Sequence, residues 1–315
     1  MSELLRVEHL KKYFKTPKGT LHAVDDVTFS IKKGNVLGVV GESGCGKTTL
    51  GRTILHLLPS TDGKILFDGK DVTDVKGREL KELRRRMQIV FQDPYASLDP
   101  RKNVRSIVAE PLRMYHVFSN RRQEDEFVDH LMETVGLTQR MADCYPHELD
   151  GGRRQRAGIA RALALNPDFI VCDEPVSALD VSIQAQILNL MQDLQEQREL
   201  TYMFITHDLS VVKHIASHIL VMYLGQAVEY APADELFDNP VHPYTQALLS
   251  AVPVPDIDHP RKRIVLRGEI TSPVDPKPGC RFRPRCPNCC EECEHAVTEL
   301  RELTPGHFVA CANCF

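Results

Sequence analysis

The amino-acid sequence predicts an α/β fold: a parallel core sheet with an antiparallel β subdomain, an inserted helical subdomain and a small cysteine-rich C-terminal extension. Three observations support this prediction. A glycine-rich loop stands between an apolar run and a helix, helical periodicity fills the middle of the chain, and seven of the ten cysteines lie in the last 36 of 315 residues. We expect residues 1–254 to form the main domain, with the helical subdomain at about 95–165, and residues 255–315 to form the extension.

The glycine-rich loop lies between the apolar run Val36–Val40 and the helical stretch Leu50–Leu55, and it reads Gly41-Glu42-Ser43-Gly44-Cys45-Gly46-Lys47-Thr48-Thr49. This is the strand, G-x-x-x-x-G-K-[ST] loop and helix of a P-loop, whose backbone N–H groups and helix N-terminus face a phosphate chain. Lys47 can bridge the β- and γ-phosphates, and the Thr48 hydroxyl can reach Mg²⁺. The core is therefore predicted to be that of a P-loop nucleoside triphosphatase.

The segment before the P-loop favours short antiparallel strands. Apolar and polar residues alternate over residues 5–31, a turn is expected at Pro17-Lys18-Gly19, and residues 62–69 suggest a further strand between two turns. Tyr13 and Phe14 come just before the first turn. An exposed aromatic ring there, with Phe14 as the candidate, could stack on adenine, although a strand aromatic that fills a core explains the pattern equally well.

Three apolar runs further along the chain end in polar residues. The first ends at Gln92, the second at Asp173 and Glu174, and the third is followed by His207. Buried carboxylates at a strand end are costly unless they are paired or near a metal. In a P-loop protein Asp173 suits the Mg²⁺ shell and Glu174 suits the orientation or deprotonation of the attacking water, while His207 could hydrogen-bond the γ-phosphate.

The helical region from Val104 to about Leu165 contains a second glycine-rich turn, Leu149-Asp150-Gly151-Gly152-Arg153, which opens a helix. Two glycines at a helix start create an N-terminus that accepts anions. A plain helix start with a solvated basic face is the alternative.

Taken together, residues 4–250 resemble the ATP-binding subunit of an ABC transporter. The resemblance covers the Walker A loop, the Q-loop at Gln92, a signature-like turn, the Walker B strand, a D-loop at Ser177–Asp180 and a switch histidine. It implies that Lys47, Gln92, Glu174 and His207 are catalytic. It further implies that ATP contacts the P-loop, Gln92, Asp173 and Asp150-Gly151-Gly152, and that Mg²⁺ contacts Thr48, Gln92 and Asp173.

Three segments look like the dipeptide, oligopeptide and nickel importer branch of that superfamily: Phe91–Arg101, Tyr145–Leu149 and His242–Leu249. The resemblance implies an ATPase that pairs with a second ATPase subunit, docks on two membrane permease subunits and energises import of di- or oligopeptides from an extracytoplasmic substrate-binding protein. Nickel chelates or other small solutes are the alternative cargo. It also implies a peripheral location at the cytoplasmic face of the membrane.

The signature turn departs from the family pattern. The family sequence is L-S-G-G-Q, whereas this chain has Asp150 in place of the serine and Arg153 in place of the glutamine. In the family dimer the signature serine faces the γ-phosphate on the opposite subunit. A carboxylate there costs several kcal/mol at about 4 Å unless an arginine compensates. We therefore favour a heterodimer in which the site completed by Asp150 turns over poorly; compensation by Arg153 is the alternative.

The C-terminal cysteines Cys280, Cys286, Cys293 and Cys311 have the spacing C-x5-C-x6-C-x17-C. This resembles the tail of dipeptide-importer ATPases, which implies a 4Fe-4S cluster. Thiolates are soft ligands that suit Fe-S or Zn²⁺, so a zinc site, with His295 or His307 as further candidate ligands, is the alternative. Free surface thiols are a third interpretation, with the oxidation hazard that seven of them would bring.

The composition argues against nucleic-acid binding and against a membrane-spanning segment. The formal net charge of −4 indicates no general affinity for nucleic acid. No apolar stretch approaches the length of a membrane span, and the first residues lack the apolar core of a signal peptide, so we expect a cytoplasmic protein. A regulatory subunit that clamps nucleotide without turnover, with a redox-sensing tail, is the alternative function; the presence of Glu174 and His207 argues against it.

Overall fold

The computed structural model describes residues 2–252, 263–266, 268, 272–295 and 299–314. The chain divides into two compact units, residues 1–74 with 204–315 and residues 75–203. The domain boundary predicted at 254/255 lies outside the described residues and stays a prediction. Within the described ranges, no helix has the length and apolar character that a membrane crossing requires.

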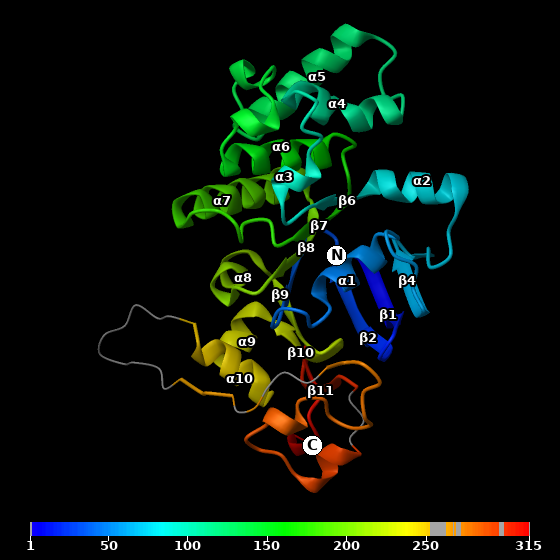
Figure 1. Ribbon diagram of the computed structural model, residues 1–315, viewed down its shortest axis with the longest axis vertical. Helices are drawn as coiled ribbons and strands as arrows, with labels where there is room; N and C mark the ends of the chain where they lie inside the picture. Colours follow the sequence, from blue (N-terminus) through cyan, green and yellow to red (C-terminus); the bar gives the residue numbers. More distant parts are fainter. Residues whose placement is uncertain (1, 253–262, 267, 269–271, 296–298, 315) are drawn as a thin grey trace. The chain divides into compact units, whose positions relative to one another are not determined.

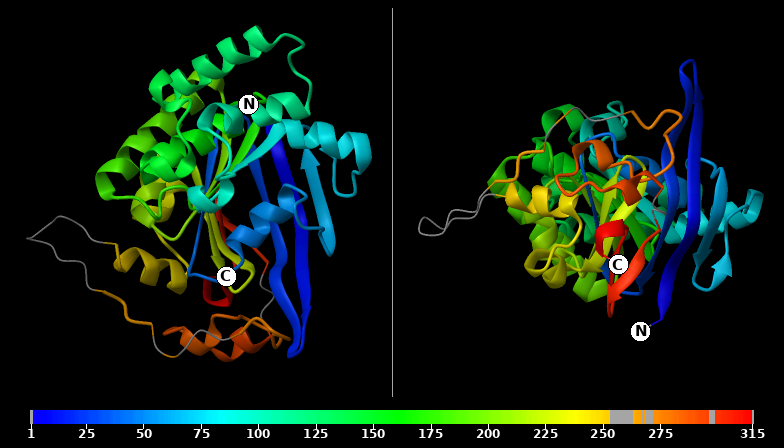
Figure 2. Two further views of the ribbon diagram at one scale, coloured as in Figure 1. Left: turned by 45° about the horizontal axis from the view of Figure 1, so that its top comes forward. Right: turned by 90° about the horizontal axis from the view of Figure 1, so that it is seen from below.

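The first unit contains an antiparallel sheet with the strand order β2-β1-β4-β5. Its strands are β1 (Glu3–Thr16), β2 (Gly19–Lys32), β4 (Asp62–Phe67) and β5 (Lys70–Asp71). The turn expected at residues 17–19 is confirmed, but the strands that it joins have 14 residues each and are not short. Four register shifts along β1 and β2 let this long hairpin bend while the strands stay paired, and its length is plain in Figure 2.

A second sheet contains the strand order β11-β12-β10-β9-β3, and β8 (Thr201–Thr206) follows β3 in that order. Every residue of β3 is buried, as expected for a strand covered on both faces. β3 pairs with β9 in parallel, whereas β9, β10, β12 and β11 pair antiparallel. The bounds are β3 (Val36–Val40), β9 (His218–Tyr223), β10 (Gln226–Pro232), β11 (Arg301–Thr304) and β12 (His307–Val309).

The helices described in the first unit are α1 (Lys47–Ile54), α8 (Leu209–Ile215), α9 (Ala233–Asp238) and α10 (Pro243–Ser250). Figure 1 shows α9 beside α10 and near β10, and α9 also packs against α8. A core of buried side chains is formed by residues of β9, β10, α8, α9 and α10, together with Val40 of β3. Burial of such apolar surface is the main favourable term in the folding of this unit.

Described residues of the predicted C-terminal extension take part in the core of the first unit. Phe282, which is 1% exposed, belongs to the core of the first unit, and Cys280 and Cys286 pack against that core. β12 pairs with β10, so the extension also adds two strands to the sheet. Its described residues also form the short 3-10 helices η3 (Arg283–Arg285), η4 (Glu291–Glu294) and η5 (Ala312–Cys314).

The second unit is mainly helical, and its helices include several in the stretch for which the sequence predicts them; the bounds of a helical subdomain at about 95–165 stay a prediction. α6 contacts α3, α4, α5 and α7, and β6 pairs in parallel with β7. Figure 1 shows α6 between α4 and α7. The elements are α2 (Gly77–Arg86), β6 (Met87–Val90), α3 (Pro94–Ser97), α4 (Val104–Met114), α5 (Arg121–Thr134), η1 (Gln139–Met141), η2 (Pro146–Glu148), α6 (Gly151–Leu163), β7 (Phe169–Asp173) and α7 (Val181–Arg198).

Candidate functional site

The P-loop in the first unit joins β3 to α1. Gly46 caps α1 in the left-handed conformation with φ 105°, and a Cβ there would lie 2.0 Å from the carbonyl oxygen of Ala23. Gly41 has φ 151°, and its Cβ would lie 2.2 Å from the carbonyl oxygen of Met222. Only glycine fits these two positions, because a side chain at either one would collide with the backbone of a neighbouring segment.

The ammonium group of Lys47 points back over this loop. Its Nζ donates hydrogen bonds to the carbonyl oxygens of Gly41 at 2.7 Å and Glu42 at 3.0 Å, and the side chain is 5% exposed. A buried cation held by carbonyl dipoles at a helix N-terminus can exchange these bonds for phosphate oxygens. The loop therefore fits a bound phosphate chain in shape, donors and charge.

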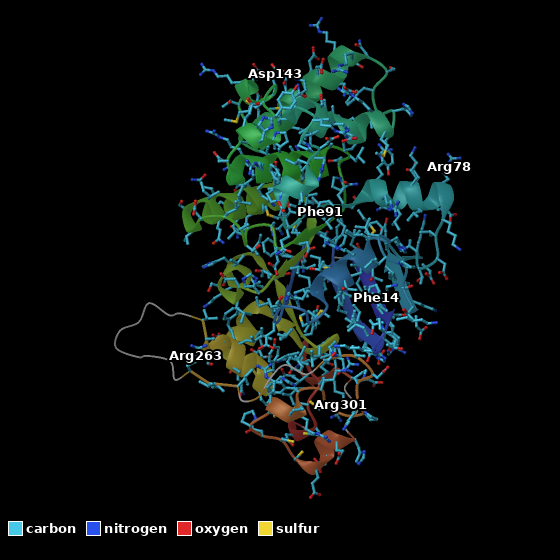
Figure 3. The ribbon with its side chains drawn as sticks, viewed as in Figure 1. Phe14, Arg78, Phe91, Asp143, Arg263 and Arg301 are labelled. Carbon is cyan, nitrogen blue, oxygen red and sulfur yellow. The ribbon has the colours of Figure 1, made fainter. Side chains whose placement is uncertain are left out.

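The predicted adenine-stacking residue, Phe14, lies on β1, and Figure 3 labels it there. The ammonium group of Lys12 lies 4.8 Å from the centre of its ring. Tyr13 points to the other face of the strand, where its ring stacks on His22 at 3.9 Å and its hydroxyl donates to Asp25. Both rings are half-buried, and the adenine contact of Phe14 stays a prediction.

In the second unit, β7 ends with the predicted carboxylates. Asp173 is 1% exposed, and the next residue, Glu174, has a left-handed backbone with φ 45°. The side-chain amide of Gln92 donates to Glu174 Oε2 at 3.0 Å. Ser177 in the predicted D-loop donates through its hydroxyl to the carbonyl oxygen of Glu174 at 3.1 Å. The structure thus brings together two of the four predicted catalytic side chains.

The signature-like turn starts α6 as predicted. Asp150 is its N-cap: Oδ1 accepts from the backbone N–H of Arg153 at 2.8 Å, while Oδ2 lies 3.3 Å from Arg153 Nε. Gly152 faces α7, since a Cβ there would lie 2.6 Å from Ile183 Cγ2. Gly151 lies near Leu179 in the same way, at 3.0 Å. Both glycines thus allow close packing against the D-loop and α7.

His207 follows β8 and is exposed in the first unit, which also contains Lys47. The next residue, Asp208, caps α8 by accepting from the N–H of Ser210 at 2.8 Å. The predicted site residues therefore fall into two groups, one in each unit. Their catalytic, nucleotide and Mg²⁺ roles stay predictions.

The four cysteines predicted to bind metal lie near one another. After burial, which has the largest effect, the neighbouring thiols of Cys293 and Cys311 raise the pKa of Cys280. Burial and the other three thiols raise the pKa of Cys286 to about 11. Even so, in the part of the chain that the structure describes, no three His, Cys, Asp or Glu side chains form a group that could hold a metal ion.

One of the two histidines predicted as candidate zinc ligands, His307, has another partner. His307 is 1% exposed, and its Nε2 lies 2.8 Å from Oε1 of the fully buried Glu229 on β10. Its Nδ1 lies 3.7 Å from Glu235 on α9. The hydrogen bond with Glu229 has the largest effect on the pKa of His307 and raises it despite burial, and the charge of Glu229 raises it further. The imidazole is paired with carboxylates and not with thiols.

Comparison with known proteins identifies the family. The family profile described as "ABC transporter" matches residues 24–177, and the profile "Oligopeptide/dipeptide transporter, C-terminal region" matches residues 228–293. The chain is 52% identical to the oligopeptide transport ATP-binding protein AppF of Bacillus subtilis over 98% of this chain and 96% of that protein. This chain belongs to the ABC transporter ATP-binding proteins. It is also 51% identical to OppF of the same organism, over 99% of this chain and 97% of that protein.

Solved structures confirm the ABC ATPase fold. The chain is similar to cbiO1 from Clostridium perfringens, part of the ABC transporter complex cbiONQ, with a TM-score of 0.68 and 28% identity over 76% of this chain and 92% of that one. It is equally similar to the dimeric ATP-binding cassette MJ0796 bound to ADP and Pi, with a TM-score of 0.67 and 28% identity over 73% of this chain and 99% of that one. The ABC ATPase core is therefore common to all of these proteins.

Proposed function

We propose that this ABC ATPase hydrolyses ATP to energise the import of oligopeptides. The names of its full-length relatives and the match to an oligopeptide/dipeptide transporter C-terminal region support the peptide cargo. The observation that carries the hydrolytic role is the hydrogen bond from Gln92 to Glu174 directly after a buried Asp173. A purely nucleotide-clamping subunit would not need an oriented carboxylate at this strand end.

The proposed mechanism is in-line attack of water on the γ-phosphate. The amide of Gln92 orients the carboxylate of Glu174, which would accept a hydrogen bond and then a proton from the water. Lys47 offsets negative charge on the phosphates, and His207 donates to the γ-phosphate. Thr48, Gln92 and Asp173 would hold Mg²⁺, which supplies further positive charge at the transferred group.

The partners follow from the same proposal. This subunit pairs with a second ATPase subunit, docks on two membrane permease subunits at the cytoplasmic face, and receives its cargo through a substrate-binding protein. The relatives, which are named as transport or import ATP-binding proteins, support a place in such an assembly. The dimeric cassette to which the chain is similar supports the pairing of two ATPase subunits.

We further propose that the two ATP sites of this assembly are unequal. Asp150 and Arg153 are 60% and 50% exposed, and such an exposed pair contributes only about 0–1 kcal/mol. That is less than the several kcal/mol of repulsion between a carboxylate and a phosphate at about 4 Å. Unlike a serine, Asp150 also has no hydroxyl proton to donate to a γ-phosphate. The ATP site that it completes therefore turns over more slowly.

The C-terminal thiols support a metal-binding proposal. Cys280, Cys286, Cys293 and Cys311 would hold a 4Fe-4S cluster, which would cross-link four points of the extension. Their spacing, their soft donor atoms and their mutual effects on pKa support this proposal. A single zinc ion would need sulfur atoms about 3.8 Å apart, and it remains the second candidate. Iron, zinc and sulfide analysis of the protein purified without oxygen, with Cys280→Ser as comparison, distinguishes the two.

The experiment that tests hydrolysis compares the purified full-length chain with Lys47→Ala and Glu174→Gln. Lys47→Ala should abolish ATP binding, because it removes the buried cation from the P-loop. Glu174→Gln should bind ATP normally but lose hydrolysis by at least about a hundredfold, since a general base contributes roughly 10²–10⁴-fold. ATP binding by Lys47→Ala at wild-type affinity would overturn the assignment of the nucleotide site.

A further inference from the structure

One side chain of the segment between Cys280 and Cys286, that of Arg285, contacts the P-loop. The guanidinium of Arg285 forms a bidentate ion pair with the carboxylate of Glu42, with Nη1–Oε2 at 2.8 Å and Nη2–Oε1 at 3.1 Å. The Arg285 side chain is 8% exposed and the Glu42 side chain 24%. The two residues lie 243 positions apart in sequence, yet the second position of the P-loop is held from the C-terminal extension.

The same P-loop residue is also held through its backbone. The N–H of Glu42 donates to the hydroxyl of Tyr244 at 2.8 Å, and the ring of Tyr244 packs against Tyr223 at 4.8 Å and Phe282 at 5.5 Å. Arg285 Nη1 also donates to the Tyr223 hydroxyl at 3.4 Å. Three aromatic rings therefore fix the place from which Arg285 reaches Glu42.

A second arginine of the segment anchors it independently. Arg281, with a side chain 7% exposed, pairs with Asp25 and donates to the carbonyl oxygen of Leu224. Burial alone would raise the pKa of Asp25, but hydrogen bonding from Tyr13 and the charge of Arg281 bring it below its usual value. This pair keeps the segment in place when the Arg285 contact is changed.

The negative charge of Glu42 affects how well the P-loop can bind the phosphates of ATP. The carbonyl oxygen of Glu42 lies 3.0 Å from Lys47 Nζ, so the backbone of Glu42 is already in contact with this ammonium group. Without Arg285, the Glu42 side chain would be free to turn toward Lys47. Its carboxylate would compete with phosphate for Lys47 and add a negative charge beside a polyanion. Arg285 removes both effects, since a bidentate guanidinium holds the carboxylate in one direction and offsets its charge.

We propose that Arg285 is a positioning residue for ATP binding: the C-terminal extension holds and neutralises Glu42 so that the P-loop and Lys47 accept the phosphate chain. This inference rests on the proposed P-loop site. Arg285 acts through Glu42 and does not itself touch the nucleotide. The extension is thereby part of the nucleotide-binding machinery of this ABC ATPase.

The test measures ATP affinity by calorimetry on the full-length chain. Arg285→Ala should weaken ATP binding by about tenfold, as expected for one uncompensated charge near the phosphates. The double variant Arg285→Ala with Glu42→Gln should regain affinity to within about threefold of Glu42→Gln alone, because no carboxylate is left to release. The matched control is Arg283→Ala in the same 3-10 helix, whose partner is the exposed Glu294. It should bind ATP as wild type does.

Further readouts separate positioning from a structural role. Arg285→Ala should raise the KM for ATP while kcat at saturating ATP stays within about twofold, and Arg285→Lys should be intermediate because it keeps the charge but loses the bidentate bond. Wild-type affinity in Arg285→Ala, or equal weakening in the single and double variants, would overturn the proposal. The Lys47→Ala variant tests the P-loop site separately from the role of Arg285. If this variant binds ATP normally, the assignment of the P-loop as the nucleotide site is wrong.

Discussion

Two glycines in α6 give opposite predictions for the same substitution. At Gly158, among the described residues, no atom lies within 4 Å of an added Cβ, so alanine fits. The gain is about 1 kcal/mol from helix propensity. At Gly152 the Cβ would lie 2.6 Å from Ile183 Cγ2, whereas ordinary carbon contacts are about 3.5–4.0 Å, so α6 or α7 must move by about 1 Å.

The size of the effect at Gly152 follows from the stiffness of its neighbour. Ile183 is branched at Cβ and cannot turn one methyl group away without moving the other carbons. Overpacking of this kind costs about 1–3 kcal/mol, which equals or exceeds the helix-propensity gain. Gly152→Ala should therefore be less stable than Gly158→Ala by about 1–3 kcal/mol, although both changes add one methyl group to one helix.

Urea unfolding of both variants and the wild type measures this difference. ATP turnover in the assembled transporter adds a second readout, because a shift of about 1 Å at a site can cost on the order of a hundredfold. We expect Gly152→Ala to lose turnover and Gly158→Ala to keep it. Equal stability and equal turnover in the two variants would refute the packing argument at the signature turn.

Three further predictions concern pH and the signature. Burial lowers the pKa of His242 to about 4, so the folded protein favours the neutral imidazole. This contribution to stability is fully present above the unfolded pKa of about 6.5. The free energy of unfolding should fall by up to about 3 kcal/mol as the pH drops from 6.5 to 4. The pKa of His307 is raised, so its contribution is complete below about 6.5 and is lost as pH rises through the folded pKa; urea titrations should show a decline that His307→Gln abolishes. Asp150→Ser keeps the N-cap and should raise turnover at one ATP site by about tenfold or more; unchanged turnover would contradict unequal sites.

Local patterns were sufficient for much of the site. The P-loop, the polar residues that follow strands at Gln92 and Glu174, and the helix opened by Gly151-Gly152 depend on residues adjacent in sequence, and the structure places them in the expected elements. Their roles depend on how distant segments meet the nucleotide, which periodicity does not encode. The expectation of short N-terminal strands was wrong, because the register shifts that allow two 14-residue strands leave no simple alternation.

The extension was the least predictable part. Its cysteines drew attention to metal binding, whereas the structure shows contacts with the ABC ATPase core that include those of Arg281, Phe282 and Arg285. These residues look like ordinary surface and turn residues in sequence. Their partners are distant in sequence: Asp25 lies 256 positions from Arg281, and Glu42 lies 243 positions from Arg285. His307 illustrates the same point, since burial beside Glu229 and not its spacing from cysteines decides its role.

The most direct test of the central claim is Glu174→Gln in this chain alone, within the assembled transporter, with ATP hydrolysis and oligopeptide uptake measured together. The account predicts that the complex assembles and binds ATP, and that both hydrolysis and uptake fall by at least about a hundredfold. If most hydrolysis and uptake survive, the partner subunit performs the catalysis, and this chain is a nucleotide-binding regulatory subunit.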